Sequence, residues 1–161
     1  MGTQDEASFG LIGLVRRGWA ERGSRPKALL FHVRKYVNVF AIRTKRNFIY
    51  LYSKKKSQKA FIRLLKKARK KLGKIFIFVD GAKAHKGKLV QEFLRKNKKT
   101  IRIAFFPPYS PEMNPTEQCW KVGRKQVANK PLRTVQTVMY QLDKVFGNPK
   151  LMPKMFDYLS H

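Results

Sequence analysis

The stretch Ile75-Phe76-Ile77-Phe78-Val79-Asp80 decides the fold of this chain. Its five consecutive apolar residues predict a buried strand, of the parallel kind that has both faces covered. A carboxylate at the carboxyl end of such a strand lies where open α/β sheets bind their ligands. We therefore expect Asp80 to belong to a functional site.

The residues before this strand predict a series of antiparallel strands. A short apolar segment from Asp5 to Leu14 indicates a first strand, and the basic, glycine-containing segment Arg16–Pro26 indicates a loop or hairpin. Three further runs have the composition of strands: Ala28–Val33, Tyr36–Arg43 and Phe48–Tyr52.

Helical periodicity begins at residue 57. Apolar residues recur there at helical spacing and predict a helix over Ser57–Leu72, with Ser57 as its N-cap and Gly73 as its stop. A loop over Gly81–Gly87, a helix over Lys88–Asn97 and a strand over Ile101–Phe106 are expected next. Pro107–Pro111 is expected to be irregular. A helix capped by Asn114, with Pro115 at its first position, and a helix over Thr134–Phe146 complete the set. This order predicts one α/β domain over residues 1–161, with a mixed sheet and helices on its faces.

The charge of the chain indicates a polyanionic partner. Its 161 residues include 37 Lys and Arg against 9 Asp and Glu, which gives a formal net charge of +28. Nucleic acid is the expected partner. No apolar run is long enough to span a bilayer, so no membrane is expected. The single Cys119 excludes an internal disulfide and fits a reducing, cytoplasmic compartment.

Three acids lie at the ends of predicted elements that could meet: Asp5, Asp80 and Glu117. A cluster of carboxylates is costly because like charges repel, and divalent cations relieve that repulsion. Oxygen ligands without His or Cys favour Mg²⁺ or Mn²⁺. Two such ions about 3.5–4 Å apart would activate a water or a 3′-hydroxyl against a phosphodiester.

The residues alone leave other readings open. Glu117 could complete a capping box with Asn114, Asp5 could be a surface acid, and Asp80 could cap the following loop. His85 could be an ordinary loop histidine, and Trp120 is expected to be a core residue rather than a base-stacking one.

Two long stretches carry a resemblance to a known family. The first runs from Asp80-Gly81-Ala82-Lys83-Ala84-His85-Lys86 to Phe105-Phe106-Pro107-Pro108-Tyr109-Ser110-Pro111-Glu112-Met113-Asn114-Pro115-Thr116-Glu117-Gln118-Cys119-Trp120. The second is the opening, Gln4–Gly10 and Arg17–Pro26. Together they resemble the Tc/mariner superfamily of DDE transposases, in particular its prokaryotic insertion-sequence branch.

The resemblance implies an RNase H-like fold and a metal-binding catalytic triad of Asp5, Asp80 and Glu117, whereas Glu6 and Glu112 are not members of it. The implied chemistry is Mg²⁺-dependent strand cleavage at transposon ends, followed by attack of the freed 3′-hydroxyl on target DNA. The region of the basic loop contributes partner-subunit or DNA contacts in relatives. The candidate nucleic-acid contacts are Arg16, Arg17, Arg22, Arg25, His85, Lys86, Lys121 and Arg124.

The resemblance also sets expectations about partners. Relatives act as dimers on paired DNA ends, and a helix-turn-helix region normally precedes the catalytic core. That region is absent here, so a separately encoded helix-turn-helix partner is one expectation, with a nucleoid-associated location. The alternative function is a non-catalytic remnant that binds nucleic acid without sequence preference. The proline-tyrosine-serine-proline signature argues against a different RNase H-like nuclease, such as a junction-cleaving enzyme.

Overall fold

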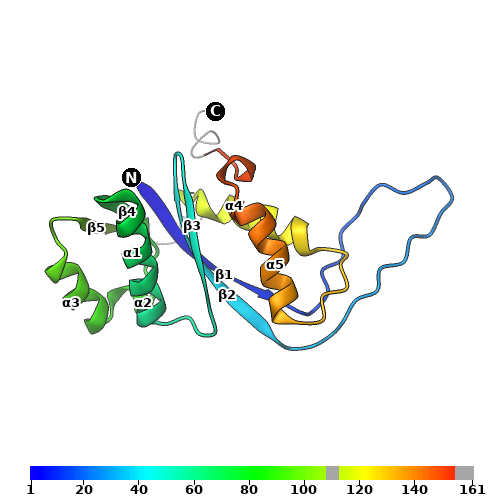
Figure 1. Cartoon of the computed structure of the whole chain (residues 1–161), viewed down its shortest axis with the longest axis horizontal. Helices are drawn as coiled ribbons and strands as arrows, with labels where there is room; N and C mark the ends of the chain where they lie inside the picture. The colour runs from blue at the N-terminus through cyan, green and yellow to red at the C-terminus, as the bar shows by residue number, and fades with distance from the viewer. Residues whose placement is uncertain (108–112, 155–161) are drawn as a thin grey trace.

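A computed structural model describes residues 1–107 and 113–154. Most of the irregular Pro107–Pro111 segment therefore lies outside the described residues. Five strands form one sheet in the order β3-β2-β1-β4-β5 (Figure 1). Their bounds are β1 Gly2–Gly10, β2 Tyr36–Thr44, β3 Phe48–Ser53, β4 Ile75–Val79 and β5 Ile101–Phe105. The pairs β1/β2 and β2/β3 are antiparallel, while β1/β4 and β4/β5 are parallel.

Helices cover both faces of the sheet. On one face α1 (Gln58–Leu72) and α3 (Lys88–Lys96) form a core with β2, β3, β4 and β5, and the short α2 (Lys83–Lys86) joins β4 to α3. On the other face α4 (Thr116–Val127), α5 (Val135–Phe146) and the 3-10 helix η2 (Pro149–Leu151) follow in sequence, and α4 and α5 pack on β1, β2 and β3. This arrangement confirms the predicted mixed sheet flanked by helices.

Local sequence signals set the ends of α1 and α5. The Ser57 hydroxyl accepts a hydrogen bond from the Ala60 N–H, and Gly73 ends α1 with a φ of 73°, a conformation that glycine adopts without steric cost. Thr134 caps α5 through a reciprocal pair of hydrogen bonds with Thr137. These caps satisfy backbone groups that a helix end leaves unpaired.

The predicted strand at Ala28–Val33 is wrong. Residues 11–35 form a long loop between β1 and β2 that extends away from the body of the molecule (Figure 1). Leu29 and Val33 are exposed, because no strand or sheet face of the described residues lies against these apolar side chains. The first strand also ends at Gly10 rather than Leu14, because its pairing with β2 ends where Gly10 lies opposite Tyr36.

Three smaller expectations also change. The described residues leave one face of β4 partly open, with Phe76 40% exposed, rather than covering both faces. The expected loop Gly81–Gly87 contains α2. The helix expected to begin at Pro115 begins at Thr116, and the Asn114 side chain accepts from the Thr116 N–H. In the part of the chain that the structure describes, no helix is both long and apolar enough to cross a membrane.

Candidate active site

Asp5 lies on β1, the strand between β2 and β4, and its side chain faces α4. Its Oδ1 accepts from the Glu6 backbone N–H at 2.8 Å, and its Oδ2 accepts from the Trp120 indole N–H at 2.7 Å. Burial raises the pKa of Asp5 to about 6, although both hydrogen bonds lower it. The negative charges of Glu117 and Glu6 add to the rise. Asp5 is thus a crowded, half-buried carboxylate rather than a surface acid.

Trp120 fixes Asp5 in place. The indole is 1% exposed and packs edge-on against Phe9 and Phe146. The prediction that Trp120 belongs to the core is therefore confirmed, but its N–H also holds one oxygen of the carboxylate. A buried indole N–H needs an acceptor, so packing and site geometry depend on the same residue. The sequence indicated that Trp120 packs in the core but did not indicate its hydrogen bond to Asp5.

Asp80 follows β4 and is linked to Glu6 through the buried side chain of His85. Its Oδ1 accepts from the Ala82 N–H at 3.0 Å and contacts His85 Nδ1 at 2.8 Å, while His85 Nε2 lies 2.9 Å from Glu6 Oε1. The hydrogen bond from His85 is the main cause that lowers the pKa of Asp80, and burial opposes it. Both contacts use Oδ1 of an exposed side chain, which leaves Oδ2 for a further ligand.

His85 is buried between two acids and is not exposed to DNA. Its side chain is 1% exposed and its ring lies 4.4 Å from the Phe61 ring. Burial alone would lower the pKa of His85, but the hydrogen bonds to Asp80 and Glu6 and their charges outweigh it and raise the pKa to about 9. With both nitrogens engaged, His85 is not available to a phosphate. Its inclusion among the candidate DNA contacts does not fit this geometry.

The pairing of β1 with β4 brings Asp5 and Asp80 into the same region of the sheet. Gly2 pairs with Ile77 and Thr3 with Phe78, Asp5 lies two residues beyond the last pair, and Asp80 directly follows β4. Their side chains nevertheless have partners in different layers, Trp120 in one and His85 in the other. Successive side chains of a strand point to opposite faces. Glu6 therefore points to the face of the sheet where it contacts His85, although the family resemblance does not include Glu6 in the triad.

Glu117 lies in the first turn of α4, as predicted, and is exposed. Among the described residues its side chain has no capping hydrogen bond to Asn114, and its charge contributes to the raised pKa of Asp5. Within residues 1–107 and 113–154, no three acidic, His or Cys side chains lie together closely enough to hold a metal ion. The structure therefore brings Asp5 near Glu117 and places Asp80 after the strand next to β1, without gathering all three carboxylates at one point among the described residues.

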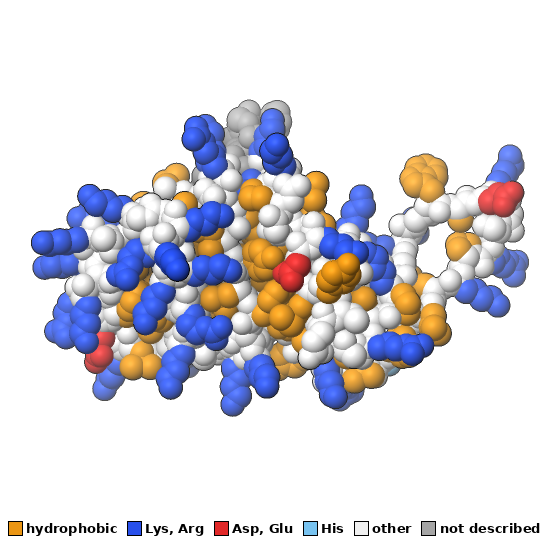
Figure 2. Space-filling view, viewed as in Figure 1, with side chains coloured by type: hydrophobic (Ala, Val, Ile, Leu, Met, Phe, Trp, Pro, Cys, Tyr) orange, Lys and Arg blue, Asp and Glu red, His pale blue; other side chains and the backbone are white. Residues whose placement is uncertain are grey.

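The remaining basic candidates are exposed. Lys121 and Arg124 follow Glu117 at helical spacing and share its face of α4, and the Lys86 ammonium lies 5.0 Å from the centre of the Phe105 ring. Arg16, Arg17, Arg22 and Arg25 lie on the long loop. The backbone N–H and C=O of Arg16 both bond to the Asn129 side chain, which anchors the loop base to the end of α4. Figure 2 shows Lys and Arg across the visible face.

Comparison with known protein families assigns the chain. The DDE superfamily endonuclease family matches residues 2–139. The chain belongs to this family. No curated protein sequence matches it.

Solved structures share the fold of this chain. The catalytic domain of Mos1 mariner transposase superposes with a TM-score of 0.67 at 15% identity, covering 94% of this chain and 72% of that one. The mariner Mos1 paired-end complex with Mg gives 0.70 at 16%, covering 94% and 49%. A simian T-cell lymphotropic virus intasome gives 0.59 at 14%, covering 89% and 47%. The chain spans about half the length of the matched chains in these two complexes. The likeness confirms the RNase H-like fold.

The oxygen donors of Asp5, Asp80 and Glu117 suit a hard divalent cation. The three acids offer only oxygen, as Mg²⁺ and Mn²⁺ prefer. Asp5 has a raised pKa because burial and two neighbouring acids disfavour its charged form, and a cation would relieve both effects.

The raised pKa of His85 predicts a pH-dependent contribution to stability. The folded-state value of about 9 exceeds the ordinary value of 6.5. Protonated His85 therefore stabilises the fold fully below pH 6.5, and this contribution is lost as the pH rises through 9. Between those two pH values we expect the melting temperature of wild type to fall more than that of His85→Gln. Thermal melts across this range measure the difference. Parallel curves for the two proteins would contradict the assignment.

Proposed function

We propose that this chain is the catalytic core of a DDE transposase, which cleaves DNA strands and transfers the freed 3′-hydroxyl to target DNA. Asp5, Asp80 and Glu117 would hold two Mg²⁺ or Mn²⁺ ions. The observation that carries the proposal is the parallel pairing of β1 with β4, since β1 holds Asp5 and Asp80 directly follows β4. The effect of the Glu117 charge on Asp5 supports the third member.

When bound, the cations would supply Lewis-acid activation of the attacking hydroxyl and stabilisation of the leaving oxygen. The chain's own residues would orient the ligands. Trp120 and the Glu6 N–H hold the two oxygens of Asp5, while His85 holds one oxygen of Asp80. Such second-layer hydrogen bonds fix the direction of metal ligands. The exposed basic residues on α4 and on the long loop would bind phosphates of transposon ends and target DNA.

The partners follow from the same proposal. We infer that the loop of residues 11–35 contacts DNA or a second copy of the chain, because it extends from the body and carries exposed Arg residues and the fully exposed Trp19. A homodimer on paired DNA ends completes the proposed assembly. The resemblance to the insertion-sequence branch supports action at the nucleoid, in the cytoplasm of a prokaryote.

A nicking assay tests the proposed function. Purified chain incubated with supercoiled plasmid and Mn²⁺ should convert it to the open circle, and EDTA should abolish this conversion. Mg²⁺ should support a slower reaction, and Ca²⁺ should not replace Mn²⁺. Folded chain that binds plasmid but yields no metal-dependent open circle would contradict the proposal.

A second function, nucleic-acid binding without catalysis, is favoured by one observation. In the described part of the chain no three metal-binding side chains lie together, while the net charge of +28 is sufficient for binding. Both functions predict affinity that falls steeply with salt. The nicking assay distinguishes the two functions, because only a transposase core cleaves phosphodiester bonds.

A further inference from the structure

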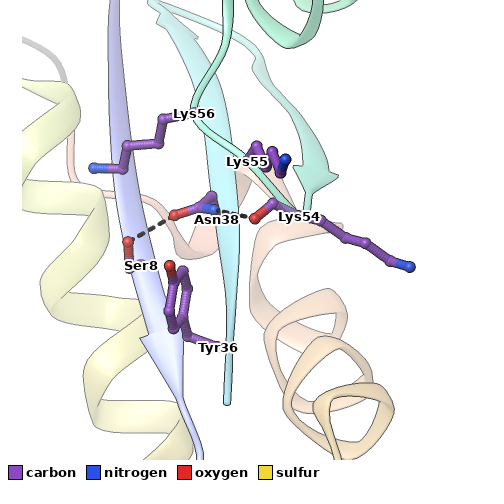
Figure 3. A pocket seen from close by; sticks show the side chains of 6 residues that line it. All are labelled: Ser8, Tyr36, Asn38, Lys54, Lys55 and Lys56. Atoms are coloured by element: carbon purple, nitrogen blue, oxygen red, sulfur yellow. Dashed lines mark hydrogen bonds between the residues drawn. The ribbon is translucent and has the colours of Figure 1, made fainter. Parts of the chain in front are cut away.

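An open pocket of about 400 Å³ lies beside the candidate site. It is lined by Ser8, Tyr36, Asn38, Lys54, Lys55 and Lys56 (Figure 3), and these six residues are called the lysine pocket below. Ser8 lies two residues after Glu6 and so shares its face of β1. The charge of Lys56 acts on Asp80, since it is one of the causes that lower the pKa of that acid. The pocket and the acid that follows β4 are therefore neighbours.

Hydrogen bonds hold the lysine pocket in shape. The Ser8 hydroxyl donates to Asn38 Oδ1 at 2.8 Å, and Asn38 Nδ2 donates to the carbonyls of Ser53 and Lys54. Asn38 is 2% exposed, so this bridge is buried. It ties the loop between β3 and α1 to the sheet. The three consecutive lysines thus extend from a fixed backbone rather than from a free loop.

Tyr36 forms an uncovered aromatic wall. It is 60% exposed and lies opposite Gly10, whose lack of a side chain leaves the ring open. In Figure 3 the Tyr36 hydroxyl points toward Ser8, while the Lys56 side chain extends across β1 on the other side of the opening. The Lys54 side chain points away from the floor of the pocket. The opening therefore has a ring on one side and an ammonium group on the other.

This combination suits one nucleotide. Aromatic side chains stack on bases while lysines neutralise the backbone, which is how single strands are bound without sequence preference. Bases inside a duplex already stack on each other, so an exposed Tyr36 ring is useful only to an unpaired base. The volume of the pocket lies in the range of small-ligand sites and does not admit a duplex.

We propose that the lysine pocket binds an unpaired nucleotide of single-stranded DNA next to the phosphodiester that is cleaved. Its place in the reaction rests on the proposed function. The base lies on Tyr36, the phosphates contact Lys55 and Lys56, and the Ser8 hydroxyl oxygen accepts from the base or sugar.

Two labelled DNA probes test the pocket by fluorescence anisotropy. One is a blunt duplex, and the other is the same duplex with an overhang of about six thymidines, within the usual range of single-strand sites. Wild type should bind the overhang probe more tightly. Tyr36→Ala should weaken overhang binding about tenfold and change blunt-duplex binding less than about twofold. Tyr36→Trp, which keeps a stacking surface, should retain the preference.

Matched control variants distinguish binding in the lysine pocket from the general attraction of DNA to a positively charged surface. Tyr140→Ala removes an exposed tyrosine of α5 that also has a lysine, Lys144, over its ring, and it should leave the preference intact. A triple change of Lys54, Lys55 and Lys56 to Ala should reduce the preference. The same change at the exposed Lys70, Lys71 and Lys74 of the far end of α1 and the loop after it removes equal charge and should weaken both probes alike.

The outcomes distinguish the pocket from the proposed function. If wild type binds the two probes with equal affinity, the proposal that the lysine pocket binds a nucleotide is overturned. The same holds if Tyr36→Ala keeps the preference for the overhang probe, even where metal-dependent nicking is intact. A preference that depends on Tyr36 in a chain that never nicks supports the pocket as a nucleotide site and overturns only the catalytic role.

Discussion

Asp80→Asn is expected to abolish metal-dependent nicking of supercoiled plasmid, with a loss of about 10³-fold or more. The change keeps the shape of the side chain but removes the negative charge that would hold the cations, and metal stabilisation of the transition state is worth several kcal/mol. Because Asp80 is exposed and follows β4 rather than lying in the core, the fold should survive. Quantifying open-circle product against time measures the loss.

Glu92→Gln is the matched control for Asp80→Asn. Glu92 is an exposed acid of α3, so its change removes the same charge away from the site and should leave nicking within about twofold, as for other surface substitutions. DNA binding should be retained in both variants. If Asp80→Asn nicks as fast as Glu92→Gln, then Asp80 is not a metal ligand and the proposed triad is wrong.

Trp120→Ala is expected to give a large loss of stability. The change removes a 1% exposed indole from the core on the α4 face and leaves Asp5 Oδ2 without its donor. Truncating a buried Trp to Ala costs about 3–5 kcal/mol, which lowers the melting temperature by roughly 6–20 °C for a chain of this size. Thermal denaturation followed by circular dichroism measures the shift.

The second tryptophan provides the control. Trp19 is fully exposed on the long loop, so Trp19→Ala should leave the melting temperature unchanged. Trp120→Phe separates the two roles of the indole, since it keeps an aromatic ring but loses the N–H. It should cost about 1–3 kcal/mol, the penalty of a buried acceptor that loses its partner. Equal melting temperatures for Trp120→Ala and Trp19→Ala would contradict the described packing.

Elements with strong local signals were predicted well from the sequence. The apolar run of β4 and the helical periodicity of α1 each specify one structure, and Ser57 and Gly73 mark the helix ends. The strand predicted at Ala28–Val33 failed because a strand needs a partner as well as suitable residues. Pairing between β1 and β2 begins only where Tyr36 faces Gly10, and no local pattern reveals that point.

The candidate site was predictable only in part. Acids at the ends of predicted strands indicated Asp5 and Asp80, and the two strands concerned, β1 and β4, are indeed paired in parallel, although Asp5 lies within β1 rather than at its end. The contact between Glu6 and His85 joins residues 79 positions apart, so neither spacing nor motif pointed to it. The two consecutive acids of β1, Asp5 and Glu6, carry the signal that could have indicated this contact. Consecutive side chains of a strand point to opposite faces of the sheet, so one of the two acids must face away from α4.

The position of β1 makes this strand sensitive to changes of length. It bonds to β2 along one side and to β4 along the other, and its side chains alternate between two helical layers. Deleting one residue between Glu6 and Phe9, with Phe9 kept in the core, would shift the preceding residues by one position and turn their side chains to the opposite face. The Asp5 carboxylate would then meet α1 and α2, and Glu6 would meet α4. Point substitutions in β1 should therefore be tolerated far more often than single-codon insertions or deletions.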